Sequence, residues 1–283
     1  MRTVVVVAAT SLAIVRVAAQ QPESPAPAGD WRAHESGYYR VFTRDESDAD
    51  LVFARQWLDA AERLMASKYR VTPARYHMSV YLLPAPERDI NASQSGQNQC
   101  CTTGADGIHT GTIYFLGPSA SLWRLAPLKS SLGLPKEGLD YHAKVLMSEY
   151  IPIGHYAVQD ARPAGGWRYY SAPEWFVQGL QEYDGIYHTT DANRRDTSSA
   201  LLAWARSHRN VFECCDRGLI ISDAYNGGAT FMAFLADRFG EDVHRRILAS
   251  GAASFDEALR NETGSAPVTQ TFEEFQAWLA GSR

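Results

Sequence analysis

The sequence predicts an α+β fold in which a small mixed β-sheet with a helix on one face precedes a mainly helical half. Strand-like and helix-like segments alternate in the first part of the chain, whereas the patterned segments after Gly138 have helical spacing. The 283 residues are 45% hydrophobic, which is enough for a sizeable core. We therefore expect a single domain over residues 31–283, with a sheet half at about 31–120 and a helical half at about 138–283.

The N-terminus has the composition of a secretion signal. Arg2 supplies a positive charge, the apolar run TVVVVAATSLAIV follows, and the small residues VAA at 17–19 resemble a cleavage site. This run is too short to span a bilayer, and no later segment is apolar enough to do so. A Pro- and Ala-rich linker at 20–30 follows the expected signal peptide at 1–19. These features predict a secreted or otherwise extracytoplasmic protein without a membrane span.

The first part of the folded chain alternates between strand and helix patterns. The stretch ADLVFARQWLDAAERLMASKY is amphipathic, because its apolar residues recur at helical spacing. A polar stretch from Glu87 to Asp106 is expected to be a loop that carries the first cysteine pair. The expected strands are YYRVFTR (38–44), YHMSVYLLP (76–84) and GIHTGTIYFLG (107–117), and the apolar stripe of the helix comprises Leu51, Ala54, Leu58, Ala61 and Leu64.

Helical patterns dominate from Gly138 onward. The expected helix LDYHAKVLMSEYI runs into Pro152, which lacks a backbone donor and predicts a kink. The next helix, PEWFVQGLQEYDGIY, begins with Pro173 in a favoured first-turn position, and we expect it to pack beside the first. The helix DAYNGGATFMAFLADRFG ends at Gly240, a typical C-cap. Further helices are expected in TSSALLAWARSH, DVHRRILAS, SFDEALRNETG and TFEEFQAWLAG.

Four cysteines form two adjacent pairs, Cys100-Cys101 and Cys214-Cys215. In an exported protein, disulfides are the default state of such cysteines. Neighbouring cysteines bridge only through a strained ring. We therefore expect at least one disulfide between the two pairs, which would bring the segments that carry them together. A four-thiolate zinc site is disfavoured, because the C-x-x-C spacing is missing.

The charge pattern argues against nucleic acid as a partner. The formal net charge is −5, and the sequence contains no basic stripe, no RNA-binding aromatic motif and no Gly-rich phosphate loop.

The order of these segments resembles the gluzincin metallopeptidases, in particular the small exported proteins of the peptidase MA-like group. The resemblance rests on SEYIP and WFVQGLQEY, and on AYNGGATFMAFLADRFG, SFDEAL and FEEFQAWL nearer the C-terminus. It covers nearly the whole mature chain, from about Tyr38 to Trp278. The family carries H-E-x-x-H on one helix and W-[FL]-x-E-G-x-A-E-Y on the next. The resemblance therefore implies a peptidase-like fold whose site lies between these two helices.

This sequence departs from the family at the zinc ligands. In the family, both histidines and a glutamate of the next helix bind zinc, and the glutamate between the histidines is the general base. Here Ser148 and Pro152 stand at the histidine positions and Gln178 stands at the third ligand position. Serine and glutamine are poor zinc ligands, and proline has no ligating group. Glu149 keeps the base position, and Glu182 also matches. Because all three ligand positions are changed, we expect no metal cofactor at the inherited site.

A relocated metal site is an alternative, with Glu149, His155 and Glu182 as the zinc ligands. Tyr225 stands where the family often has a tyrosine that stabilises the developing oxyanion. Trp175 ends the Gly-punctuated stretch GGWRYYSAPEW, and loops of this kind often line substrate grooves.

Together these features predict an exported pseudopeptidase whose cleft binds a peptide, glycan or protein partner without hydrolysis. The alternative is an active hydrolase, with either a relocated metal or a metal-free mechanism that uses Glu149. Glu149 and Glu182 would then form a carboxylate pair of the kind found in glycosidases. The expected catalytic positions are Glu149 and Tyr225, and the expected binding positions are Ser148, Pro152, Gln178, Glu182, His155 and Trp175.

Overall fold

The computed structural model describes residues 30–44, 48–83, 96–120, 129–136, 138–162, 165–215, 218–264 and 267–281. The predicted signal peptide at 1–19 and the predicted linker at 20–30, apart from Asp30, lie outside these residues. Among the helices within them, none is long and apolar enough to cross a membrane.

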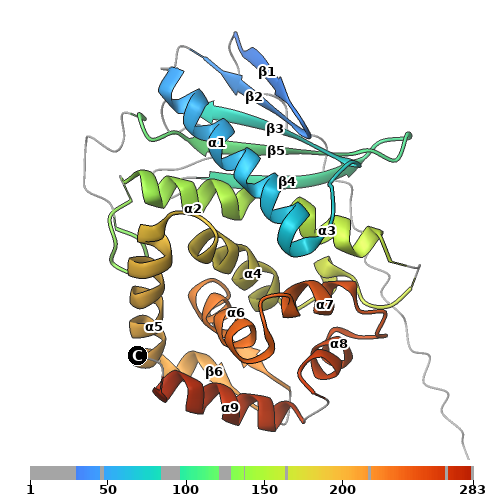
Figure 1. Cartoon of the computed structure of the whole chain (residues 1–283), viewed down its shortest axis with the longest axis vertical. Helices are drawn as coiled ribbons and strands as arrows, with labels where there is room; N and C mark the ends of the chain where they lie inside the picture. The colour runs from blue at the N-terminus through green and yellow to red at the C-terminus, as the bar shows by residue number, and fades with distance from the viewer. Residues whose placement is uncertain are drawn as a thin grey trace, which may run out of the picture.

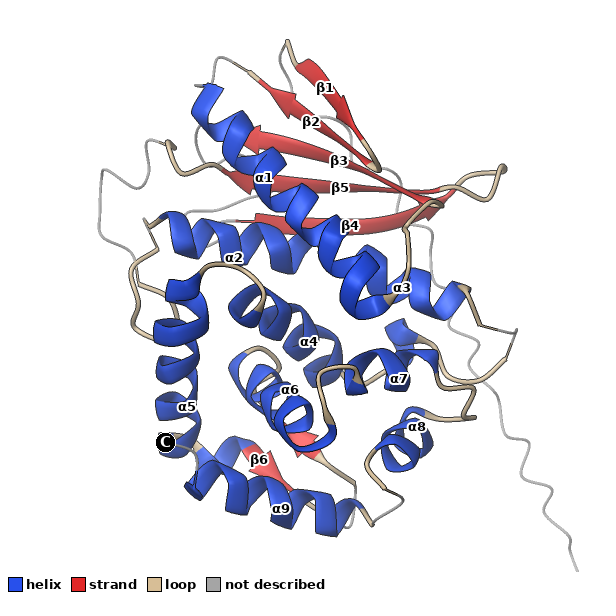
Figure 2. Ribbon diagram, viewed as in Figure 1, coloured by secondary structure: helices blue, strands red, loops and turns tan. Residues whose placement is uncertain are grey.

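A mixed β-sheet forms the N-terminal half and helices form the rest, so the predicted α+β class is confirmed (Figures 1 and 2). The strand order is β1-β2-β3-β5-β4. The central strands β2, β3 and β5 run parallel, whereas β1 and β4 pair antiparallel at the two ends of the sheet. The strands are β1 (Arg32–Ser36), β2 (Tyr39–Thr43), β3 (Tyr76–Leu83), β4 (Gly96–Thr103) and β5 (His109–Leu116).

Two strands differ from the prediction. β1 was not expected, and it forms a hairpin with β2 through a turn at Gly37, whose φ of 45° lies in the left-handed region. The polar stretch predicted to be a loop contains β4, so that prediction is wrong for residues 96–103. Its sequence GQNQCCTT lacks the alternation of apolar and polar residues that identifies most strands, because β4 lies half-buried at the end of the sheet.

The helix predicted between the first strands is α1 (Asp48–Leu64), which continues as a π-helical turn at Met65–Tyr69. It crosses one face of the sheet, with α2 beside it below β4 (Figure 1). The predicted break at Pro152 divides the next helical stretch into α2 (Leu139–Tyr150) and α3 (Pro152–Asp160). The remaining helices are α4 (Glu174–Tyr187), α5 (Ser198–Ser207), α6 (Asn226–Phe239), α7 (Val243–Ala249), α8 (Phe255–Glu262) and α9 (Val268–Gly281).

One continuous apolar core joins the sheet to the helices. On β3, Met78 and Val80 face this core with α1 and α2, whereas Tyr81 and Leu83 face a smaller cluster that includes Trp31. This division follows from the two-residue period of a strand. The deep helix α6 is buried along most of its length, and its Phe231 packs against Phe275 of α9 and Trp175 of α4.

Candidate functional site

The helices α2 and α4 pack side by side, as the sequence predicts. A side-chain carbon added to Gly185 of α4 would lie 2.2 Å from the Ser148 hydroxyl of α2, so the helices approach closely at this point. At their edge, Lys144 Nζ lies 2.5 Å from Glu182 Oε2. Burial alone would lower the pKa of Lys144, but the Glu182 carboxylate outweighs this effect and the pKa is raised. The ion pair therefore keeps a positive charge between the two helices.

Glu149 is held half-buried between α2 and the strand β4. The Asn98 side-chain amide of β4 donates a hydrogen bond to the Glu149 backbone carbonyl at 2.5 Å. Gly96 lies against the Glu149 side chain, because a carbon added there would be 3.0 Å from Glu149 Cγ. Burial raises the pKa of Glu149 to about 7, and the negative charge of Glu182 acts in the same direction while Lys144 opposes it. This carboxyl group is therefore poised to gain or lose a proton near neutral pH.

Tyr225 completes this group of side chains from the start of α6. Its side chain is 52% exposed, which is unusual for so large a ring. Partial burial raises the pKa of its hydroxyl, and the charges of Glu149 and Glu182 add to the effect, so the hydroxyl lies within electrostatic reach of both carboxylates. We refer to Lys144, Glu149, Glu182 and Tyr225 as the Glu149 site.

The residues at the positions that the resemblance aligns with zinc ligands do not fit a metal ion. Ser148 is only 6% exposed, and it fills the contact between α2 and α4 at Gly185. Pro152 is buried at the first turn of α3, and Gln178 is half-buried on α4. None of these three offers a carboxylate, imidazole or thiolate. No step of a reaction at this site is therefore assigned to zinc.

The alternative zinc site at Glu149, His155 and Glu182 is not formed either. His155 is completely buried on α3, with Nε2 at 3.1 Å from Asp184 Oδ2 and Nδ1 at 3.0 Å from the Tyr169 hydroxyl. Glu182 is engaged with Lys144 instead. Within the described ranges, no three His, Cys, Asp or Glu side chains gather closely enough to hold a metal ion.

His155 belongs to a buried charge network that sequence reasoning missed, because no motif links its members. Lys68 Nζ, in the π-helical turn after α1, donates to Asp184 Oδ1 at 2.8 Å, and the Tyr69 hydroxyl donates to Asp184 Oδ2 at 2.6 Å. Burial alone would raise the pKa of Asp184, but Lys68 and His155 hold it well below its usual value. The network joins α3, α4 and the turn after α1, and gives their contact a fixed geometry.

Trp175 lies in the core rather than at an accessible surface. It is 5% exposed, and its ring contacts Phe176, Phe231 and Phe255. Four of the residues expected to bind a ligand are buried, namely Ser148, Pro152, His155 and Trp175. The expected site residues that remain accessible to a ligand are Glu149, Gln178, Glu182 and Tyr225.

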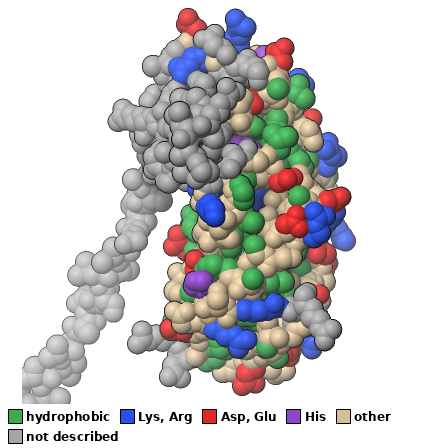
Figure 3. Space-filling model, turned by 90° about the vertical axis from the view of Figure 1, so that its left-hand side faces the viewer, with side chains coloured by type: hydrophobic (Ala, Val, Ile, Leu, Met, Phe, Trp, Pro, Cys, Tyr) green, Lys and Arg blue, Asp and Glu red, His purple; other side chains and the backbone are tan. Residues whose placement is uncertain are grey.

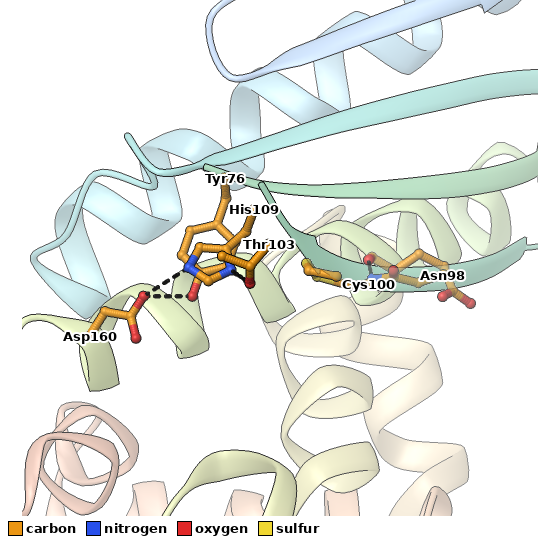
Figure 4. The surroundings of a disulfide bond; sticks show 8 residues. Tyr76, Asn98, Cys100, Thr103, His109 and Asp160 are labelled. Atoms are coloured by element: carbon orange, nitrogen blue, oxygen red, sulfur yellow. Dashed lines mark hydrogen bonds and ion pairs between the residues drawn. A yellow bond between two sulfur atoms is a disulfide. The ribbon is translucent and has the colours of Figure 1, made fainter. Parts of the chain in front are cut away.

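The predicted disulfide between the cysteine pairs is wrong. Cys100 is bonded to Cys101 and Cys214 to Cys215. The first pair lies within β4, and the second follows the short strand β6 (Phe212–Glu213). β6 lies beside α9, far from β4 along the long axis of the molecule (Figure 1). A bond between the pairs is excluded by this separation. Figure 4 shows the first disulfide on the same strand as Asn98, which contacts Glu149.

The first disulfide interrupts β4 beside the Glu149 site. The register of β4 with β5 shifts between Gln99 and Thr102, so the regular part of the strand next to the site is Gly96–Gln99. Beyond the shift, the Thr103 hydroxyl lies 2.8 Å from His109 Nδ1, at the other end of the strand (Figure 4).

The surface around these elements carries no broad basic area on the face that Figure 3 shows. There, Lys and Arg side chains are interspersed with acidic and hydrophobic ones over the described residues. This distribution gives no support for binding of a nucleic-acid backbone on that face.

No protein-family model matches this chain, and no curated protein matches it in sequence.

Proposed function

We propose that this protein is an exported, gluzincin-like pseudopeptidase that binds an extended peptide at the Glu149 site without a catalytic zinc ion. The observation that carries this proposal is the contrast within one helix pair. Glu149 keeps a half-buried carboxyl group within electrostatic reach of the exposed Tyr225, whereas Ser148 and Pro152 at the former ligand positions are packed into the core. A site that has lost its metal ligands but keeps accessible polar and aromatic groups is suited to binding.

The strand β4 favours a peptide over other ligands. Among the described strands β4 pairs with β5 alone, so it is an end strand of the sheet, and peptides bind to sheets by adding a strand at such an end. Asn98 ties this strand to the Glu149 backbone, and its own Oδ1 is buried without a hydrogen-bond partner among the described residues. Buried carbonyl oxygens of this kind normally accept a hydrogen bond. A peptide that pairs with Gly96–Asn98 would pass next to Glu149.

The proposal is tested by selecting peptides from a random library in the presence of a chelator. The binding site of the selected peptide is then mapped by amide hydrogen exchange. We expect slower exchange at Gly96–Asn98, and weaker binding after Tyr225→Ala, because this substitution removes the exposed ring of the site. Tyr170→Ala is the matched control, since Tyr170 is also exposed, at 75%, but lies before α4. Protection elsewhere, or equal weakening by both substitutions, would contradict the proposal.

A metal-free hydrolase is the second candidate, and a specific observation favours it. A carboxyl group with a pKa of about 7 can both donate and accept a proton at neutral pH, and Glu149 has this property. Glu182 supplies a second carboxylate in its surroundings. This candidate predicts turnover of a peptide or glycan substrate in the presence of a chelator, a rate maximum near pH 7 and loss of turnover in Glu149→Gln. Binding without turnover would exclude the hydrolase and support the pseudopeptidase.

A further inference from the structure

A second site lies on the opposite side of α4, away from α2. It is a pocket of about 360 Å³, near the lower end of the range of roughly 300 to 1,000 Å³ that small-molecule sites occupy. Three aromatic rings line it, those of Tyr183 and Tyr187 on α4 and Trp278 on α9. Two carboxylates, Asp237 at the end of α6 and Glu241 in the following turn, also line it. The pocket therefore combines aromatic faces with negative charge.

The aromatic side chains are held in place by their neighbours. Tyr183 and Tyr187 lie one turn apart on α4, and their rings stack with centroids 4.6 Å apart. The Trp278 indole nitrogen donates to Asp237 Oδ2 at 2.9 Å, and the Tyr183 hydroxyl lies 3.0 Å from both carboxylate oxygens of Glu241. Each carboxylate is thus fixed beside a ring. The floor is formed by the small residues Ala233 and Ala236, which leave space between the rings.

The negative charge of the pocket is not neutralised from within. None of the described residues that line it is lysine or arginine. His188 Nε2 lies 3.9 Å from Glu241, but burial and the charge of Lys68 lower the pKa of His188 to about 4, so this ring is neutral at pH 7. Burial and the charges of Glu241 and Asp237 raise the pKa of Tyr187 to about 12, which is consistent with a negative potential at its hydroxyl.

The protein already places an ammonium group against one of these rings. Lys68 Nζ lies 4.5 Å from the centroid of the Tyr183 ring, on the interior side where Asp184 neutralises it. An ammonium ion between aromatic faces and carboxylates gains both a cation–π attraction and an ion pair. The Tyr187 ring and the two pocket carboxylates offer the same combination to a ligand from solution. A neutral or anionic ligand of the same shape gains neither.

We propose that this pocket binds an alkylammonium cation, either a free amine or the side chain of a lysine in a peptide. The cation lies against Tyr187 and Trp278, with Asp237 and Glu241 as its counter-charges. This site is separate from the Glu149 site, and it does not depend on the function proposed there.

The test is a calorimetric and NMR titration of the full mature protein with Nα-acetyl-lysine methylamide. Its neutral counterpart is Nα-acetyl-norleucine methylamide, which has the same alkyl chain without the ammonium group. We expect saturable binding of the lysine compound, with shifts at Tyr187 and Trp278, and binding of the norleucine compound that is at least about 5-fold weaker. Binding of n-butylammonium with equal affinity would identify a free amine as the ligand. Several-fold tighter binding of the lysine compound would identify a peptide side chain.

Variants separate this site from general charge attraction. Glu241→Gln removes a charge that is 65% exposed on its side chain, so the fold is retained, and it should weaken binding by roughly 3- to 10-fold. Glu273→Gln removes one charge from the exposed face of α9 outside the pocket, and it should leave the affinity unchanged. The absence of saturable binding would overturn the proposal. Equal affinity for the norleucine compound, or equal weakening by both substitutions, would overturn it as well.

Discussion

Replacing Glu149 with glutamine should stabilise the protein relative to the natural protein, and this gain in stability should be larger at alkaline pH than at acidic pH. In the folded state the pKa of Glu149 is about 7, compared with an ordinary value of 4.5. The folded protein therefore binds a proton that the unfolded chain has released between these two pH values. Stability must then fall as pH rises through this window, because the native state holds more protons than the unfolded state.

The size of the effect follows from the same values. The difference between a pKa of 4.5 and one of about 7 corresponds to about 3 kcal/mol at most. Solvent access to the half-buried carboxylate reduces the expected value to about 2 kcal/mol. Glutamine resembles the protonated acid and carries no charge at any pH, so Glu149→Gln escapes this loss. Its gain in the free energy of unfolding should approach zero below pH 4.5 and reach about 2 kcal/mol at pH 8.

Urea unfolding of both proteins at pH 4.5, 6 and 8 measures this difference. The other titrating groups are the same in both proteins, so most of their contribution cancels. Glu273→Gln, on the exposed face of α9, is the control and should show a difference that stays near zero at every pH. A difference between Glu149→Gln and the natural protein that does not change with pH would refute the account of Glu149 as a buried, proton-binding group.

Two further substitutions test the surroundings of the site. Asp184→Asn leaves Lys68 buried without its counter-charge. It should therefore lower the free energy of unfolding by about 3 to 5 kcal/mol in a urea titration at pH 7. A loss below about 1 kcal/mol would contradict the claim that Asp184 neutralises Lys68 in the folded protein. Gly185→Ala places a methyl group against the Ser148 hydroxyl and should cost about 1 to 3 kcal/mol by the same measurement. Gly251→Ala is its control, because no atom lies within 4 Å of the added carbon. The double substitution Ser148→Ala with Gly185→Ala should recover only part of the loss, because the Lys144 carbonyl oxygen of α2 also lies 2.8 Å from the added carbon. No loss of stability in Gly185→Ala itself would mean that α2 and α4 are not in close contact at this point.

The helices were the most predictable part of the structure. The stripe of Leu51, Ala54, Leu58, Ala61 and Leu64 predicted α1, because one buried face of a long helix imposes a period that local sequence reveals. Proline had an equally local effect and marked the break between α2 and α3. The strand β4 escaped prediction because it lies half-buried at the end of the sheet, where polar residues such as those of GQNQCC are tolerated.

Contacts between distant residues were predictable only where a helix pair fixed them. The order of SEYIP and WFVQGLQEY was enough to place α2 beside α4, and with them Glu149 near Glu182. The buried network was not predictable, because Asp184 is 29 residues from His155 and 116 residues from Lys68, and none of the three stands in a motif. The cysteine pairing failed for a similar reason, since it depended on the distance between two loops in space.

The central claim is that the Glu149 site binds a ligand without zinc, and the zinc content of the purified mature protein tests it most directly. The protein should be dialysed against zinc and then against metal-free buffer, and its zinc content should be measured by atomic emission. Because Ser148, Pro152 and Gln178 stand at the positions of the three zinc ligands in the peptidases that the sequence resembles, the account predicts zinc far below one ion per chain. Zinc retained at one ion per chain, and lost in Glu149→Gln, would contradict it.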